Sequence, residues 1–337
     1  MDFNERVRRK NEFDASLVYG TKKFNQLTGR DKHISFRKNN DLNWVNAKTN
    51  LVDEKFIQKR NCPLCKSNDY SPLFVKAGFP HVKCNVCSLV YVNPILNEHE
   101  YKKLWSAEDS WEVILENPEQ VKMQLLEANY SMDIVQLYLK NDKASFCDVG
   151  CGPGTLLVEA KKRGYSVYGI EPNKRCHKQL DQKGIPFTGD FFPLKENVTK
   201  TFDCVFLLNT LEHLHDPLNI VKEVKKLIKP KGYIYISVPH IDSFVSRLLR
   251  EKAGVFGGHS HIQFFSHITL SNLLQKTGFE VIEYETIITE IGVIKNYLSF
   301  EDPYFGDGKD RLDFITPEFL YKNNIARNLN ILAMNNN

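Results

Sequence analysis

From about residue 143 onwards, segments with the character of β-strands alternate strictly with segments of helical character. Short apolar strands are predicted at 144–149, 165–170, 185–188, 202–208 and 233–238. Amphipathic helices are predicted at 155–163, 174–182, 216–228 and 269–277. This alternation implies an α/β domain with a parallel sheet covered by helices on both faces. Two more strands, 279–288 and 329–334, have no clear helix between them, and we expect an antiparallel pair at the sheet edge.

The 337 residues exceed what one average domain needs, and the segment before the alternation divides into three parts. Residues 1–59 form a basic N-terminal extension, since 1–60 hold 14 Lys/Arg against 8 Asp/Glu while the whole chain is only +4. Its apolar residues suggest a segment that docks on the body of the protein. Residues 60–93 hold paired cysteines among β-rich pieces, 94–142 form a helical linker, and 143–337 form the α/β domain.

A glycine-rich turn, Asp148 to Gly154 (DVGCGPG), joins the first strand of the alternation to its helix. Glycines let the backbone turn sharply and approach a ligand with no Cβ in the way. Ligands of open α/β sheets bind at the carboxyl ends of the strands. The G-x-G-x-G spacing differs from the G-x-G-x-x-G of dinucleotide folds, and a carboxylate at Asp148 suits a ligand carrying an ammonium or sulfonium group. Glu171, at the end of the next strand, can accept hydrogen bonds from both hydroxyls of a ribose.

These features resemble the class I methyltransferases that use S-adenosylmethionine. The resemblance covers roughly 143–290 and includes Gly189-Asp190 after the third strand, NTLEHLHDP at 209–217 and a Lys-Gly turn before the fifth strand. It implies a Rossmann-like, seven-stranded methyltransferase sheet. It also implies a set of residues that bind S-adenosylmethionine: Asp148, Gly150, Gly152 and Gly154 at the methionine part, Glu171 at the ribose, Asp190 at the adenine amino group, and Asn209. The alternative is a Rossmann-like enzyme that uses NAD or a nucleotide, which the position of the third glycine disfavours.

Four cysteines follow the pattern C-x2-C-x18-C-x2-C, namely Cys62, Cys65, Cys84 and Cys87. Two such turns can present four thiolates to one zinc ion, and a metal stabilises a segment too short to bury a core of its own. The zinc is expected to be structural, because four thiolates leave no open coordination position. An iron–sulfur cluster is the less favoured alternative, since a strand at 89–92 follows the second pair. Residues 61–94 resemble the zinc-binding domain, a small N-terminal ribbon, that precedes many bacterial methyltransferases, including C-methyltransferases of nucleotide-linked deoxysugars.

Histidines are candidates for the base that would remove a proton from a hydroxyl or an acidic C–H acceptor. Residues 257–266 resemble the HEH-x-x-YFS segment of the sugar C-methyltransferases, where the second histidine is the proposed base, and His261 matches it. Gly258, Ser260 and Phe264 differ from the polar or hydroxyl-bearing residues of that segment. His213, after the fourth strand, is the alternative base.

The sequence therefore predicts an S-adenosylmethionine-dependent methyltransferase that acts on O or C of a small molecule, such as a sugar nucleotide or glycan precursor. The alternative is an RNA methyltransferase that binds nucleic acid through the ribbon and the basic extension. The ribbon loop holds only Lys66, Lys76 and Lys83, which does not favour a nucleic acid partner. A non-catalytic scaffold is a third reading, which the intact cofactor residues disfavour. We expect no signal peptide and no membrane span, hence a cytoplasmic protein; the oligomeric state is not predicted.

Overall fold

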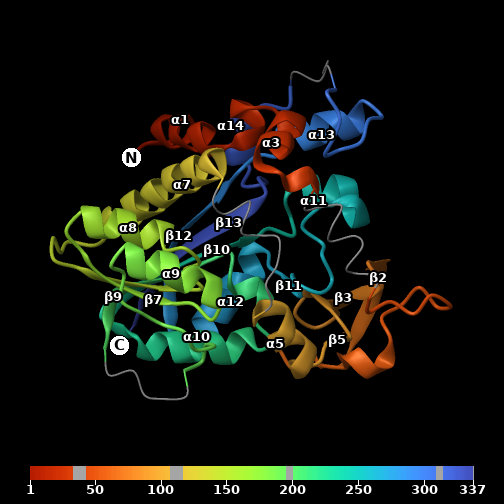
Figure 1. Ribbon diagram of the computed structural model, residues 1–337, viewed down its shortest axis with the longest axis horizontal. Coiled ribbons are helices and arrows are strands. Elements are labelled where there is room, and N and C mark those ends of the chain that lie inside the picture. Colours follow the sequence, from red (N-terminus) through yellow and green to blue (C-terminus); the bar gives the residue numbers. More distant parts are fainter. Residues whose placement is uncertain (33–42, 107–116, 195–199, 309–313, 337) are drawn as a thin grey trace.

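The computed structural model describes residues 1–32, 43–106, 117–194, 200–308 and 314–336. Within them, a seven-stranded sheet occupies the centre of the molecule (Figure 1). Its strands are β6 (Ser145–Val149), β7 (Ser166–Ile170), β8 (Phe187–Thr188), β9 (Phe202–Leu208), β10 (Ile228–Pro239), β12 (Phe279–Ile287) and β13 (Asn328–Asn335). They lie in the order β12-β13-β10-β9-β6-β7-β8. Strands β6 to β10 are parallel, whereas β13 is antiparallel to both of its neighbours, so the predicted α/β sheet and its antiparallel edge pair are confirmed.

Helices cover both faces of the sheet because successive strand residues point to opposite sides. On one face, α7 (Pro118–Gln136), α8 (Thr155–Lys162) and α9 (Lys174–Gln182) pack over a core that includes Phe146 and Phe206. On the other, α10 (Pro217–Lys226) and α12 (His267–Lys276) pack over a core that includes Val205 and Ile236. Helix α7 begins with the Asn117 side chain accepting from two backbone N–H groups and with proline at the first position.

The segment between the last two strands differs from the sequence-based expectation of no clear helix. It contains α13 (Ile291–Leu298) and α14 (Pro317–Lys322). Helices of this length are not stable from propensity alone and form because their apolar sides are buried. Helix α13 packs against α11 (Phe244–Leu249), and α14 against α1 (Phe3–Phe13). A Thr316-Pro317 start, equivalent to Asn117-Pro118, was the available signal for α14.

The N-terminal extension docks on the body of the protein, as predicted, through α1, α2 (Ala15–Val18) and α3 (Thr21–Thr28), which lie beside α7, α13 and α14 (Figure 1). The four basic residues of α1 form ion pairs within the chain. Arg6 forms an ion pair with Glu283 at 3.1 Å, and the buried Lys10 ammonium lies 2.8 Å from the Glu285 carboxylate. The Tyr130 hydroxyl donates to the same carboxylate at 2.8 Å. The cations of α1 therefore fix this helix to the sheet edge.

The segment with the paired cysteines forms a second sheet, which the α/β domain completes. Strands β2 (Tyr70–Lys76), β3 (Phe79–Cys84) and β4 (Val90–Val92) are antiparallel, and β11 (Gln263–Phe264) joins β4 from the loop after β10. Before and after this sheet, β1 (Ile57–Gln58) pairs with β5 (Ile95–Leu96), and α5 (Glu98–Ser106) follows. The boundaries at 60 and 93 stay a prediction, but the sheet itself spans both parts of the chain.

The Arg60 side chain links the cysteine-bearing segment to the loop that carries β11. Its guanidinium donates to the carbonyl oxygens of Val92 at 3.1 Å, Ile262 at 2.6 Å and His215 at 3.2 Å. Burial lowers the pKa of Arg60 to about 9, so desolvation opposes its charge and the carbonyl oxygens compensate. The planar arginine guanidinium has five N–H donors in fixed directions and can therefore bond these separate carbonyl oxygens at once, which a lysine ammonium cannot do.

Replacing Arg60 with alanine is expected to lower the free energy of unfolding by about 2–4 kcal/mol, because three carbonyl oxygens lose a charged donor. Urea denaturation followed by circular dichroism measures the change. Lys59→Ala is the matched control, since Lys59 is exposed, and it should shift stability by no more than about 0.5 kcal/mol. Equal effects of the two substitutions would contradict the linking role of Arg60.

Among the helices of the described ranges, none combines the length and the apolar character that a membrane crossing requires.

Candidate functional site

The glycine turn between β6 and α8 has a left-handed backbone at all three glycines, with φ of 80° at Gly150, 52° at Gly152 and 76° at Gly154. A Cβ on Gly150 would lie 2.5 Å from Thr210 Oγ1, and a Cβ on Gly154 would lie 2.7 Å from a methyl carbon of Leu180. A Cβ on Gly152 would meet no described atom within 4 Å. Packing therefore requires glycine at 150 and 154, whereas Gly152 faces open space in which a ligand could lie.

Glu171 connects the end of β7 to this turn. One carboxylate oxygen accepts from the Gly152 N–H at 2.7 Å, and the other accepts from the Asn173 N–H at 2.8 Å. The carboxylate therefore holds the middle of the glycine turn and still has lone pairs for further donors. Asp148, in β6, is only 4% exposed, and its Oδ1 has no hydrogen-bond partner among the residues that the structure describes. A buried carboxylate oxygen without a partner indicates that a ligand or a water molecule donates a hydrogen bond to it.

The electrostatics of the turn favour a cationic ligand. Burial, and then the charge of Glu171, raises the pKa of Asp148 to about 8, and burial also raises the pKa of Glu171. Two carboxylates close together and shielded from water are stabilised in the ionised form by a positive charge. The pair of residues therefore fits a ligand that carries an ammonium or sulfonium group.

The other predicted cofactor residues lie at the ends of neighbouring strands. Asp190 is exposed two residues after β8 and accepts a hydrogen bond from the Thr188 hydroxyl at 3.2 Å. Asn209 follows β9 with φ of 51°, and its side-chain oxygen accepts from Asn328 at 2.9 Å. Since β6 to β9 are parallel, these residues share the carboxyl edge of the sheet with Asp148 and Glu171. Their individual roles toward a cofactor stay predictions.

The two histidines proposed as alternative bases lie together, with ring centroids 4.9 Å apart. His213 ends a short 3-10 turn after β9, and its Nδ1 lies 2.9 Å from the Ser260 carbonyl oxygen. His261 Nδ1 lies 2.7 Å from the Val255 carbonyl oxygen. Because a carbonyl only accepts, both rings carry their proton on Nδ1, and Nε2 is the basic nitrogen of each. The buried Glu212 carboxylate completes the group, with one oxygen 3.8 Å from His213 Nε2.

Hydrogen bonds from Gln263 and Ile262 connect two loops and hold this group in place; we call them the clamp. The Gln263 amide, fully buried in β11, donates to the carbonyl oxygens of Leu211 at 2.8 Å and Leu214 at 2.6 Å. The Ile262 N–H donates to the Glu212 carbonyl oxygen at 3.0 Å. Neither Glu212 nor Gln263 was predicted from the sequence to be a site residue. The signal for Glu212 was its place directly before His213, whereas nothing in the sequence indicated the clamp.

Three other histidines of the described ranges, His215, His240 and His259, lie outside this group and are fully or partly buried. The His215 ring centroid is 4.2 Å from that of Tyr101, and burial lowers the pKa of His215 to about 4. His240 is buried, and its pKa is also lowered to about 4 by burial. His259 packs against Trp44, with ring centroids 5.6 Å apart. These environments favour packing roles over proton transfer near neutral pH.

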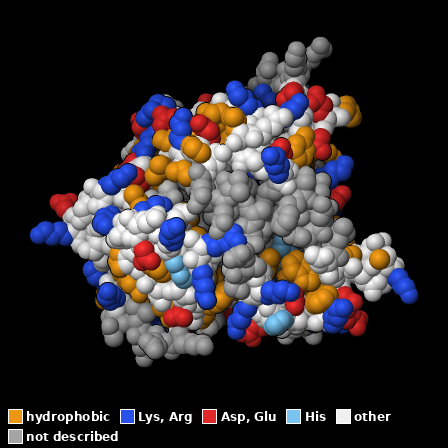
Figure 2. All heavy atoms as spheres, viewed as in Figure 1, with side chains coloured by type: hydrophobic (Ala, Val, Ile, Leu, Met, Phe, Trp, Pro, Cys, Tyr) orange, Lys and Arg blue, Asp and Glu red, His pale blue; other side chains and the backbone are white. Residues whose placement is uncertain are grey.

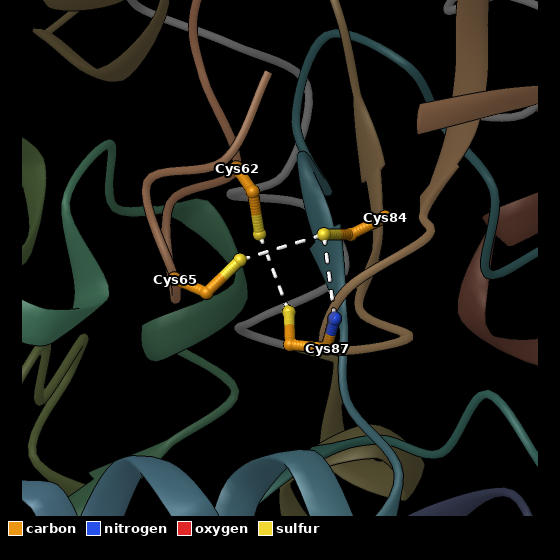
Figure 3. A group of neighbouring side chains, drawn as sticks. All are labelled: Cys62, Cys65, Cys84 and Cys87. Atoms are coloured by element: carbon orange, nitrogen blue, oxygen red, sulfur yellow. Dashed lines mark hydrogen bonds between the residues drawn. The ribbon is translucent and has the colours of Figure 1, made fainter. Parts of the chain in front are cut away.

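The four cysteines converge on one point, as Figure 3 shows. Cys62 and Cys65 come from one turn, and Cys84 and Cys87 come from the end of β3 and the turn after it. All four sulfur atoms lie within 4.8 Å of one another, and the pairs Cys62–Cys87 and Cys65–Cys84 are 3.4 Å apart. Zn–S bonds of about 2.3 Å in a tetrahedron separate the sulfurs by roughly 3.8 Å, so the donor set fits zinc. The identity of the metal stays a prediction.

Comparison with known proteins finds similarity to methyltransferases. Residues 123–284 match a family model described as a methyltransferase domain. The chain is 27% identical to the ubiquinone biosynthesis O-methyltransferase of Aliivibrio fischeri (strain MJ11) over 146 residues, which make up 40% of this chain and 62% of that protein. It is 32% identical to the enzyme of the same name from Actinobacillus pleuropneumoniae (serotype 7, strain AP76) over 101 residues, 27% of this chain and 43% of that protein.

Among solved structures, the chain resembles the 1,6-didemethyltoxoflavin-N1-methyltransferase of Burkholderia thailandensis, with a TM-score of 0.47 and 14% identity. That match covers 79% of this chain and all of the other. A second similar structure is an S-adenosylmethionine-dependent methyltransferase from Mesorhizobium loti, with a TM-score of 0.43, 16% identity, and coverage of 61% of this chain and 97% of the other.

Proposed function

Since this chain carries a class I S-adenosylmethionine-dependent methyltransferase domain, we propose that it transfers the methyl group of S-adenosylmethionine to an oxygen atom of a small molecule. The observation that carries the proposal is the glycine turn after β6, where Gly152 faces open space and the Glu171 carboxylate accepts from the Gly152 N–H. We also propose that the four cysteines bind a structural zinc ion.

The residues of the turn would hold the donor by charge and by close backbone approach. The sulfonium group of S-adenosylmethionine supplies a methyl group that is already activated for transfer. Asp148 and Glu171 oppose its positive charges, and the Glu171 carboxylate retains lone pairs for ribose hydroxyls. Gly152 lets the backbone approach the ligand without a side chain in between. With the donor held, the protein has to align the acceptor and exclude water.

An oxygen acceptor agrees with the group formed by Glu212, His213 and His261, which can assist the loss of a hydroxyl proton. It also agrees with the relatives described above, which are O-methyltransferases. The chain spans 62% of the length of the Aliivibrio relative, so the acceptor of this protein is proposed from its own site. A sugar or glycan precursor, as predicted from the sequence, is one acceptor that carries suitable hydroxyl groups.

An RNA acceptor is not favoured by the charges on the surface. Figure 2 shows Lys and Arg side chains interspersed with Asp and Glu over the described part of one face. The basic residues of α1 pair with carboxylates of the same chain, for example Arg9 with Asp133 at 2.5 Å. Nucleic acid binding depends on unpaired basic residues that neutralise phosphates.

Methyl transfer from labelled S-adenosylmethionine tests the proposal. The full chain is incubated with a catechol such as 3,4-dihydroxybenzoate, with a nucleotide sugar, and with bulk RNA, and each product is analysed by mass spectrometry. The expected result is a methyl ether on a small molecule, with S-adenosylhomocysteine formed in equal amount. Transfer to RNA alone, or to carbon alone, would overturn the oxygen and small-molecule assignment.

The affinity for S-adenosylmethionine is expected to rise as the pH increases from 6 to 8, because the donor favours ionised Asp148. With the pKa of this carboxyl raised to about 8 in the free protein, the gain should approach about tenfold per pH unit and level off above pH 8. Without ligand, the same raised pKa means that folding stability falls as the pH rises between about 4 and 8.

Calorimetry in buffers of different ionisation enthalpy measures the pH dependence of affinity together with the proton released on binding. In Asp148→Asn, which cannot ionise, both the release and the slope should disappear. A pH-independent affinity in the unmodified chain would show that Asp148 is not the group that the ligand ionises.

A further inference from the structure

A cavity of about 930 Å³ is formed by three parts of the chain that are distant in the sequence. The turn between β2 and β3 lines it with Lys76 and Ala77, the loop after α11 with residues between 251 and 259, and the end of α13 and the segment after it with residues between 297 and 305. Pockets of roughly 300–1,000 Å³ bind small molecules in proteins. The cavity therefore has room for a molecule larger than one six-membered ring.

The wall of the cavity is rich in aromatic rings. Five aromatic side chains line it, namely Phe256, Tyr297, Phe300, Tyr304 and Phe305. The Phe300 side chain is fully exposed (100%), so a molecule bound beside it would remove its ring from water. Aromatic side chains pack favourably on flat rings, because the faces and edges of the rings carry complementary partial charges. The lining therefore favours a ligand with an aromatic ring system.

The charged residues of the lining differ in sign, namely Lys76, Lys252, Glu251, Glu301 and Asp302. The Lys76 ammonium donates to the Ala253 carbonyl oxygen at 2.6 Å, and the Lys252 ammonium lies 5.5 Å from the centre of the Tyr297 ring. The Asp302 carboxylate accepts from the N–H groups of the two aromatic residues that follow Pro303. Since these charges oppose one another and bond within the chain, an uncharged ring system suits the cavity.

Contacts within the protein hold the wall of the cavity in place. The Phe256 ring packs against Phe74 in β2, with centroids 5.0 Å apart, and against Phe264 in β11, with centroids 4.8 Å apart. The Gly254 N–H donates to the Tyr304 hydroxyl oxygen. A wall that is formed before binding needs little further ordering when a ligand enters, which favours affinity.

The loop that lines the cavity also holds the two histidines of the candidate site. Phe256 lines the cavity, and the carbonyl oxygen of its neighbour Val255 lies 2.7 Å from His261 Nδ1. Further along the same loop, the Ser260 carbonyl oxygen lies 2.9 Å from His213 Nδ1. A molecule in the cavity would therefore contact the loop that positions the acceptor side of the reaction.

We propose that this cavity binds an uncharged aromatic ring system of the methyl acceptor, which extends away from the hydroxyl group that is methylated. The inference rests on the proposed function and adds an acceptor class to it. Binding of the ring system against Phe256 and Phe300 orients the acceptor, so that part of the binding free energy serves to align its hydroxyl group with the donor.

Calorimetry on the full chain saturated with S-adenosylhomocysteine tests this acceptor class. The probes are catechol and 4-phenylcatechol, which adds one uncharged aromatic ring, and we expect 4-phenylcatechol to bind at least about tenfold more tightly. Leu298→Trp, which places an indole in the cavity, should weaken binding of 4-phenylcatechol at least about tenfold, and Phe300→Ala about threefold or more. Both variants should bind catechol as the unmodified chain does. Phe314→Ala, which removes a 70% exposed ring outside the lining, is the matched control and should leave both affinities unchanged.

Further measurements separate the possible failures. Circular dichroism establishes that each variant is folded, and calorimetry with S-adenosylmethionine establishes that the donor binds. Equal affinity for the two catechols, or an affinity for 4-phenylcatechol that neither variant lowers, would refute the aromatic site and leave the proposed methyl transfer standing. Tighter binding of uridine diphosphate glucose than of 4-phenylcatechol would overturn the uncharged class. Absence of donor binding in the unmodified chain would instead overturn the proposed function, and the inference with it.

Discussion

Replacing Gly152 with alanine is expected to weaken the binding of S-adenosylmethionine about 100-fold, or ~2.7 kcal/mol, while the protein stays folded. The added methyl group meets no described atom within 4 Å, so it occupies only the space assigned to the ligand. The backbone φ of 52° at this position lies in the left-handed region, which costs an alanine roughly 1 kcal/mol. Calorimetry for affinity and urea denaturation for stability measure the two effects separately.

The neighbouring Gly150 provides the control for this prediction. An alanine there would place its Cβ 2.5 Å from Thr210 Oγ1, at a φ of 80°. Gly150→Ala should therefore lower the free energy of unfolding by about 2–4 kcal/mol, more than Gly152→Ala does. If Gly152→Ala binds S-adenosylmethionine as tightly as the unmodified chain, the open space beside Gly152 is not the ligand site.

Replacing Cys65 and Cys87 together with serine is expected to remove one equivalent of zinc and to lower the rate of methyl transfer at least about tenfold, or ~1.4 kcal/mol. The reason is the path of contacts from the metal to the site. The cysteines fix β3 and β4, β4 pairs with β11, and Gln263 in β11 holds the turn of Glu212 and His213. The glycine turn lies outside this path, so the affinity for S-adenosylmethionine should change by less than about threefold.

Zinc analysis, turnover and calorimetry on the same preparation check this prediction. Cys176→Ser, a buried thiol of α9 outside the metal group, is the control and should retain zinc and turnover. An unchanged turnover in a variant that has lost its zinc would mean that β11 is held without the metal. A parallel loss of donor affinity would mean that the whole chain has unfolded.

Much of this architecture could be predicted because its signals are local in the sequence. The alternation of strands and helices predicts the parallel sheet, and the change to two strands at the end predicts the antiparallel edge. The left-handed turn needs glycines in a fixed spacing, and four thiolates need two tight pairs. Each pattern depends on residues close together in the chain, so periodicity and spacing indicate it directly.

The features that escaped prediction depend on contacts between distant residues. The pairing of Gln263 and Phe264 with β4 joins segments about 170 residues apart, and two residues carry no strand signal of their own. Arg60, directly after the basic extension, cannot be distinguished from the charges before it until its carbonyl partners are known. Glu212 is only one residue of the segment 209–217 until its burial and its two histidine neighbours are known. Helices α13 and α14 are too short for their periodicity to be recognised.

The segment with the four cysteines is therefore in direct contact with the loops of the candidate site, and is not a separate module placed before it. Arg60 and β11 connect it to the loops that carry His213 and His261. This arrangement gives the proposed zinc ion a physical purpose beyond the folding of a short segment. A zinc ion bound there would stabilise the turn that carries Glu212 and His213, on which we propose that the acceptor side of the reaction depends.

Titration of the full chain with S-adenosylmethionine in a calorimeter tests whether the glycine turn after β6 binds the methyl donor. We expect saturable binding of one donor per chain, and a loss of at least about tenfold in affinity in Glu171→Ala, since this carboxylate accepts from the Gly152 N–H and holds the glycine turn. Asp181→Ala, which removes an exposed carboxylate of α9, should bind as the unmodified chain does. Absence of binding to the folded, zinc-loaded chain, or equal affinity in Glu171→Ala, would contradict it.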